Sequence, residues 1–93
     1  MREKTIENKL KTAVKEKGGL CLKFTSPGFD GVPDRIILMS GGKMAFADIK
    51  APGNKLRPLQ ERRKRQLETL GFSVFCIDNP ETIGGVVDEI CTA

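Results

Sequence analysis

The sequence predicts a small α/β protein in which a mixed β-sheet is flanked by helices. Three observations lead to this class: a helical apolar period at the start, short apolar stretches typical of strands in the middle, and a second helical period at the end. A basic, helix-favouring stretch lies between the last two strand-like stretches and would act as a crossover. We therefore expect the order αβββαβα in a single domain over residues 1–93.

The first helix is expected from Thr5 to Lys17, where Gly18-Gly19 ends a helical period. The apolar positions of this period are Ile6, Leu10, Ala13 and Val14. Residues 20–25 alternate between apolar and polar and predict a strand, and residues 26–31 predict a loop. In this loop Phe29 could equally contact nucleic acid or cover the core, whereas turn chemistry is favoured for Asp30.

Two further strands, at residues 31–39 and 44–50, are expected to form a hairpin around Gly41-Gly42. The first strand carries Ile36 and Leu38 on one face and Ile37 and Met39 on the other, so both faces need cover. Pro33 keeps the preceding residue extended and cannot donate a backbone hydrogen bond. Asp34 should therefore stand at the start of a strand, free to face a cleft.

The remaining elements are a helix from Pro58 to about Leu70, a strand over residues 72–77 and a last helix that starts at 79–81. The middle helix has a narrow apolar stripe of Leu59, Leu67 and Leu70, which leaves it a wide basic surface. The last helix carries Ile83, Val86, Val87 and Ile90.

The formal net charge is +4, and the positive excess is concentrated around the middle helix. A solvated helix face is the ordinary interpretation of such a run, but its place directly after a carboxylate-bearing strand favours a polyanionic partner. We expect phosphate contacts from Lys55, Arg57, Arg62, Lys64 and Arg65. Arg63 falls between Leu59 and Leu67 and is expected to be partly covered.

The chain has no histidine, which excludes histidine general bases, Ser-His triads and most catalytic zinc sites. Its three cysteines form no C-x-x-C pair, and Cys21 and Cys76 lie in apolar stretches where buried thiols are expected. This use of cysteine suits a reducing cytoplasm, the host cytoplasm if the protein is phage-encoded. No segment approaches the length of a membrane span, so no membrane partner is expected.

Asp34 and the triplet Asp48-Ile49-Lys50 are the strongest candidates for chemistry. Asp48 and Lys50 leave the same face of a strand, and Asp34 joins them if the hairpin has a three-residue loop or a bulge. The two carboxylates, with the backbone carbonyl of Ile49, would form an oxygen site suited to Mg²⁺ or Mn²⁺. Lys50 would orient an attacking water and balance charge on a phosphate. The alternative is an ordinary ion pair, of Asp48 with Lys50 or with Arg35.

This pattern, Pro-Asp followed by Asp-x-Lys, resembles the active-site signature of the PD-(D/E)XK nucleases. With Gly31-Val32 before it, Ala51-Pro52-Gly53 after it and a later Gln60, the chain resembles the stand-alone VRR-NUC branch over nearly its whole length. The resemblance implies that Glu7 adds a metal ligand and that Gln60 supports Lys50 or the scissile phosphate. Without it, Glu7 is an ordinary first-turn glutamate. The chain departs from the family pattern at Asp48, usually Glu, and at Lys64, often Tyr.

The resemblance implies a metal-dependent endonuclease that hydrolyses DNA phosphodiester bonds with Mg²⁺ or Mn²⁺. Stand-alone members of the family further imply a homodimer that cuts four-way junctions or other branched DNA. The alternatives are a non-catalytic nucleic-acid-binding module of the same fold and a monomeric nickase of flaps or single strands. A sequence-specific restriction enzyme is a third, although it usually needs more chain for base recognition.

Overall fold

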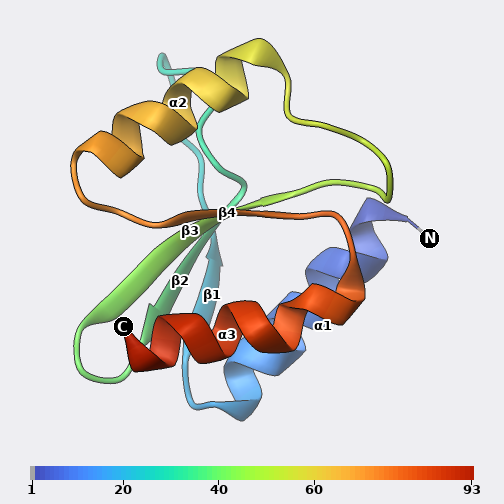
Figure 1. The fold of residues 1–93 in the computed structure, drawn as a ribbon, viewed down its shortest axis with the longest axis vertical. Coiled ribbons are helices and arrows are strands. Elements are labelled where there is room, and N and C mark those ends of the chain that lie inside the picture. Colours follow the sequence, from blue (N-terminus) through green and yellow to red (C-terminus); the bar gives the residue numbers. More distant parts are fainter. Residues whose placement is uncertain (1) are drawn as a thin grey trace.

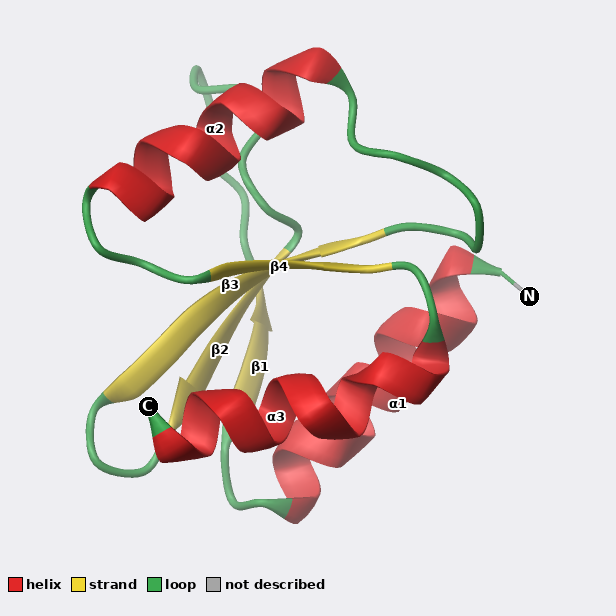
Figure 2. Ribbon diagram, viewed as in Figure 1, coloured by secondary structure: helices red, strands yellow, loops and turns green. Residues whose placement is uncertain are grey.

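The computed structural model describes residues 2–93, and its elements follow the expected order αβββαβα (Figure 1, Figure 2). The helices are α1 (Glu3–Glu16), α2 (Pro58–Thr69) and α3 (Ile83–Thr92), and the strands are β1 (Leu20–Lys23), β2 (Arg35–Met39), β3 (Lys43–Ile49) and β4 (Val74–Ile77). A short 3-10 helix, Pro80–Thr82, precedes α3 and was not expected from the sequence. The Asn79 side chain opens it by accepting a hydrogen bond from the backbone of Glu81 at 2.9 Å.

The sheet has the order β1-β2-β3-β4 and is mixed, as the sequence predicts. The β1–β2 and β2–β3 pairs are antiparallel, whereas β3 and β4 are parallel. Parallel neighbours need a crossover, which α2 supplies. Figure 1 shows that α2 lies on one side of the sheet while α1 and α3 lie together on the other, which gives three layers.

The main core fills the space between the sheet and the pair α1 and α3. Both helices turn their apolar stripes inward, and the facing sheet residues are small or branched, so the layers pack closely. The fully or almost fully buried members are Ile6, Leu10, Val14, Ile37, Ala45, Ala47, Ile49, Ile77, Ile83, Val87 and Ile90.

The α2 face of the sheet is covered much less completely. Gln60 is the buried residue of α2, while Leu59 is 40% exposed and Leu70 is 72% exposed. An aromatic group fills part of this layer, with the ring of Phe46 centred 5.6 Å from that of Phe24 and 5.9 Å from that of Phe72. The sequence predicts that other elements bury both faces of the hairpin. Only the face that packs against α1 and α3 is buried completely.

Three strands are shorter than expected, because β1 ends at Lys23, β2 begins at Arg35 and β4 begins at Val74. Of these, β1 and β4 lie at the edges of the sheet, where each pairs with a single neighbour. Within residues 2–93, no helix combines the length and apolar character needed to cross a membrane.

Candidate functional site

The hairpin between β2 and β3 closes through the three residues Ser40-Gly41-Gly42. Both glycines have positive φ, 82° and 74°, which other residues adopt only with strain. This loop pairs Arg35 with Ala47, so Asp34 falls opposite Asp48, one residue further along. The predicted three-residue loop is confirmed, and the two aspartates share the sheet face that α2 covers.

Asp34 is held in place by the chain on both sides of it. Its Oδ2 accepts a hydrogen bond of 2.8 Å from the backbone N of Ile49, at the end of β3. Its backbone carbonyl accepts one of 2.9 Å from the N of Phe24, which extends the β1–β2 ladder past the strands. Pro33, just before it, is fully buried. The Asp34 carboxylate is thus aimed at the end of β3 and only partly exposed.

Asp48 is fully buried, and neither of its carboxylate oxygens has a hydrogen-bond partner. Removal from water, followed by the charge of Asp34, raises the pKa of Asp48 to about 6, although Lys50 and Lys64 pull it down. A buried carboxylate without donors is costly unless a cation or a proton compensates it. The ion pairs of Asp48 with Lys50 or Arg35, the alternative reading of the sequence, do not form among the described residues.

Nζ of Lys64 in α2 lies 3.9 Å from Oε2 of Glu68, and the charge of Lys64 also lowers the pKa of Asp48, which the sequence did not reveal. The residue stands one helical turn after the buried Gln60, on the same side of α2, and its side chain is 34% exposed. Its charge acts on Asp48 and also on Cys76, the residue paired with Asp48 in β4. The sequence predicts only a phosphate contact for Lys64. The sequence feature that could have indicated this position is the spacing of four residues between Gln60 and Lys64, which puts both on one side of a helix.

Glu7 is not brought together with the aspartates. Its Oε2 accepts a hydrogen bond of 3.1 Å from Nε of Arg35, and the two form an ion pair. Arg35 follows Asp34 in the strand and pairs with Ala47 of the main core, so it points to the opposite face of the sheet. A role for Glu7 as a metal ligand stays a prediction; in this structure its carboxylate pairs with the largely buried guanidinium of Arg35.

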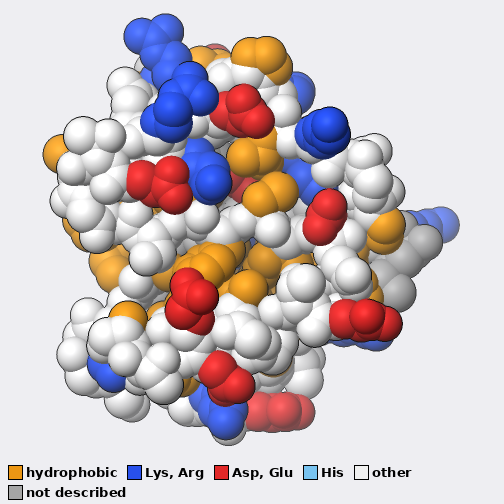
Figure 3. Space-filling view, in the orientation of Figure 1, with side chains coloured by type: hydrophobic (Ala, Val, Ile, Leu, Met, Phe, Trp, Pro, Cys, Tyr) orange, Lys and Arg blue, Asp and Glu red, His pale blue; other side chains and the backbone are white. Residues whose placement is uncertain are grey.

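Gln60 is buried and caps its own helix, since its Oε1 accepts a hydrogen bond of 2.9 Å from the backbone N of Arg57. The expected support of Lys50 or a phosphate by Gln60 stays a prediction. The basic residues around it are exposed except for Arg63 and Lys64, which are partly buried, and Figure 3 shows Lys and Arg side chains gathered over the lobe that contains α2. The exposed members among the expected phosphate contacts are Lys55, Arg57, Arg62 and Arg65.

Cys76 is exposed, contrary to the buried thiol expected from its apolar surroundings in the sequence. It lies on the edge strand β4, on the face that α2 covers incompletely. Partial desolvation and then the charges of Asp48 and Asp78 raise the pKa of the thiol. Cys21 and Cys91 are half-buried and pack against the main core.

The residues present fit a divalent cation of the magnesium type. In the part of the chain that the structure describes, no three His, Cys, Asp or Glu side chains gather into a metal cluster. The available donors are Asp34, Asp48 with its two unpartnered oxygens, and the Ile49 carbonyl. Mg²⁺ is commonly held by one or two carboxylates, with waters and substrate phosphates completing its shell. A closed four-ligand site for zinc does not fit this set.

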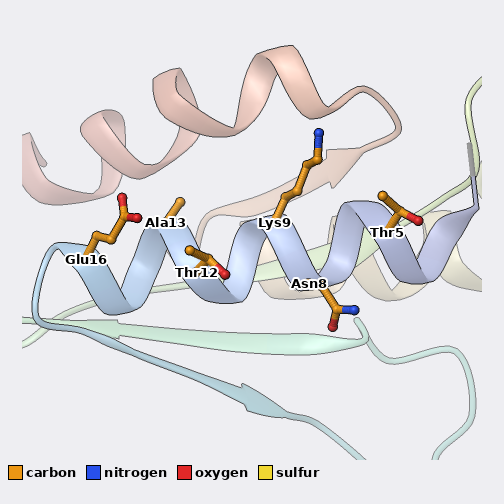
Figure 4. A pocket seen from close by; sticks show the side chains of 6 residues that line it. All are labelled: Thr5, Asn8, Lys9, Thr12, Ala13 and Glu16. Carbon is orange, nitrogen blue, oxygen red and sulfur yellow. The ribbon is translucent and has the colours of Figure 1, made fainter.

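A hollow of about 410 Å³ on the surface of α1 offers no comparable site. It is lined by Thr5, Asn8, Lys9, Thr12, Ala13 and Glu16. Figure 4 shows these side chains spread along one helix rather than directed at a common point. The polar groups that converge are those at the end of the hairpin.

Comparison with known proteins gives two similarities that cover most of the chain. The chain is 42% identical over 81 residues to "Putative nuclease p44" of Acyrthosiphon pisum secondary endosymbiont phage 1, and the match covers 87% of both proteins. A solved structure named VRR_NUC domain superposes with a TM-score of 0.87 at 23% identity, covering 92% of this chain and 94% of that one. No protein-family model matches the sequence.

Proposed function

Since the chain belongs to the VRR-NUC family of nucleases, we propose that it is a metal-dependent endonuclease that hydrolyses DNA phosphodiester bonds. The observation that carries this proposal is Asp48, a fully buried carboxylate without a hydrogen-bond partner, placed opposite Asp34 by the hairpin register. Such an arrangement is unfavourable by itself and becomes favourable when a cation binds. The chemistry therefore belongs at the end of the hairpin, beneath α2.

Mg²⁺ or Mn²⁺ held by Asp34, Asp48 and the carbonyl of Ile49 would lower the pKa of a bound water and offset charge on the phosphate. Asp34 needs little reorganisation, because the Ile49 amide already fixes one of its oxygens. Asp48 brings full negative charge in a water-poor setting, where a cation is attracted most strongly.

Two lysines, Lys50 and Lys64, would bind the phosphate of the substrate. Lys50 follows the buried strand end and acts on the Asp48 carboxylate from the sheet, while Lys64 acts on it from α2. Because the charges of both lysines act on this one carboxylate, the two side chains would hold the scissile phosphate and stabilise the charge that develops on it. Lys50 would also orient the attacking water. Gln60 contributes indirectly, because it caps α2 and so fixes the approach of Lys64.

The decisive experiment replaces each aspartate by asparagine. Asp34→Asn and Asp48→Asn should lose at least about 100-fold in cleavage of labelled DNA with Mg²⁺ or Mn²⁺, because each removes a charged ligand. DNA binding in EDTA should stay close to wild type. Full cleavage by either folded variant, or by the wild type in EDTA, contradicts the proposal.

Glu7→Gln serves as the matched control, since it removes one carboxylate charge on the other side of the sheet. It should lower stability by disturbing the partly buried pair with Arg35 while leaving the specific activity of the folded protein near wild type. If Glu7→Gln instead abolished cleavage in a fully folded protein, Glu7 would be the metal ligand that the resemblance implies.

We further propose that the protein acts as a homodimer on branched DNA, in the host cytoplasm. Two surfaces are candidates for the dimer contact, the last helix and the exposed edge of the sheet, but the last helix uses Ile83, Val87 and Ile90 within the monomer core. The other, the sheet edge, remains open: β1 has one neighbour, and Leu20 and Leu22 are 59% and 44% exposed. A contact across this edge would cover both leucines and leave each active site free.

Light scattering at micromolar protein tests the dimer, with Leu22→Asp as the disrupting variant. A species of twice 10.2 kDa that becomes monomeric in the variant supports it. Paired incisions in a four-way junction by the dimer, and single incisions by the monomer, are expected. A monomeric wild type that nicks flaps or single strands favours the nickase alternative and leaves the hydrolytic site unaffected.

A further inference from the structure

A second, separate cavity lies between α2 and the loop that connects β1 to β2. Its volume is about 260 Å³, and most of its wall is apolar. Phe24, Phe29 and Val32 line it from the loop side, and Leu67 and Leu70 from α2. Pockets for drug-sized ligands span about 300–1,000 Å³, so this one suits a single flat group. The aspartates are not among its lining residues.

Arg63 forms a fixed wall of this cavity. Its guanidinium carbon lies 3.7 Å from the centroid of the Phe29 ring, a cation–π contact. Nε donates to the carbonyl of Asp30 at 2.7 Å, and a terminal nitrogen donates to Oε1 of Gln66 at 3.0 Å. These bonds occupy Arg63 and hold the loop against the helix. The cavity is thus shaped before any ligand arrives, which limits the ordering that binding requires.

The rim of the cavity is unusually apolar for the surface of a basic helix. Phe29 is 47% exposed and Leu70 is 72% exposed, and neither is needed by the main core. Gln66 and Leu70 also line a neighbouring hollow of about 600 Å³, together with Arg62, Arg65 and Thr69. An apolar slot and a pair of arginines therefore share an edge on one side of α2.

We propose that this cavity receives an unstacked nucleobase of the DNA strand whose phosphates lie along Arg62 and Arg65. Single-stranded nucleic acid is typically held by such a combination of a basic groove for the backbone and an aromatic or apolar platform for the bases. Branched DNA with a single-stranded arm, such as a flap, offers unpaired bases beside its branch point, so the cavity would favour it over plain duplex. The inference depends on the proposed action on DNA but not on the aspartate site.

The test compares two single-stranded oligonucleotides of equal length and charge in EDTA, one with normal bases and one with abasic sites in the centre. The wild type should bind the normal strand at least about five-fold more tightly, the effect of one stacked base. Leu70→Ala, which truncates an exposed side chain, should remove this preference. Leu38→Ala, an exposed leucine outside the cavity, should retain it.

Equal affinity of the wild type for the two strands overturns the base-binding cavity, as does a preference that survives in Leu70→Ala. In either case, salt-sensitive binding of both strands would leave the proposed action on DNA intact. Failure to bind any strand would count against both. A dimer that dissociates in Leu70→Ala would assign the cavity to contact between two copies and overturn its role in binding DNA.

Discussion

The two faces of the sheet are built from the same strands but differ in burial and in the residues they carry. On the side of α1 and α3, Ile37 and its neighbours are fully buried in a continuous apolar layer. On the side of α2, the next residue, Leu38, is 36% exposed, and the layer contains a buried carboxylate and two lysines. The first face supplies stability to a chain whose core is small, and this allows the second to keep a buried carboxylate without hydrogen-bond partners, which is unfavourable by itself.

The largest contrast is expected between truncations at adjacent positions of β2. Ile37→Ala should lower the free energy of unfolding by about 2–5 kcal/mol, because it opens a cavity in the packed layer. Leu38→Ala should lower it by roughly 0.5–1 kcal/mol, since the side chain is already partly in water. Urea unfolding of both variants gives the two values. Similar losses would show that α2 packs as firmly as α1 and α3.

The second contrast concerns pH. Burial raises the pKa of Asp48 to about 6 in the folded protein, above its ordinary value of 3.8. As pH rises through this window, the unfolded chain loses its proton first, so the metal-free fold loses stability. The loss attributable to Asp48 should be about 2 kcal/mol between about pH 4.5 and pH 7.5.

Urea unfolding in EDTA at these two pH values measures the loss, with Asp48→Asn as the reference that cannot titrate. The asparagine variant should be the more stable protein at the higher pH, and Mg²⁺ should restore stability to the wild type but not to the variant. An identical pH dependence in the two proteins would mean that water or a donor reaches the carboxylate.

The third contrast tests which side of the molecule meets DNA. Replacing Arg62, Lys64 and Arg65 by alanine should flatten the salt dependence of binding by about three units of log–log slope. The matched control replaces Lys9, Lys11 and Lys15, which carry the same charge on the exposed surface of α1. Affinities measured over a range of salt in EDTA should leave this control near wild type. Equal salt dependences for the two variants would mean that DNA does not bind preferentially to the α2 side.

The smallest contrast lies within the loop that packs on α2. Gly28 and Gly31 both have positive φ, 81° and 87°, so alanine strains the backbone at either. A Cβ at Gly28 meets nothing within 4 Å, whereas one at Gly31 comes within 2.7 Å of Leu59 Cγ. Gly31→Ala should therefore be less stable than Gly28→Ala by about 1–2 kcal/mol. Equal thermal unfolding of the two would show that the loop moves away from α2 easily.

Much of the site could be predicted from local patterns. Pro33 before Asp34, and the spacing of Asp48 and Lys50 on one strand, fix which way these side chains point once the strands exist. The requirement that both carboxylates share a face predicts a three-residue loop or a bulge, and the register shows the three-residue loop. The partner of the Glu7 carboxylate could not be predicted in this way, because the ion pair with Arg35 forms only if α1 packs on the sheet face to which Arg35 points.

By itself, the sequence determined the order of the elements, the mixed sheet and the hairpin that opposes Asp34 and Asp48, because apolar period and turn chemistry act between near neighbours. Only the tertiary structure decided that Arg35 pairs with Glu7, that the charge of Lys64 acts on the pKa of Asp48 and that Cys76 is exposed. Each of these depends on where a helix rests on the sheet. That placement is set by the packing of residues far apart in the chain, which no local pattern records.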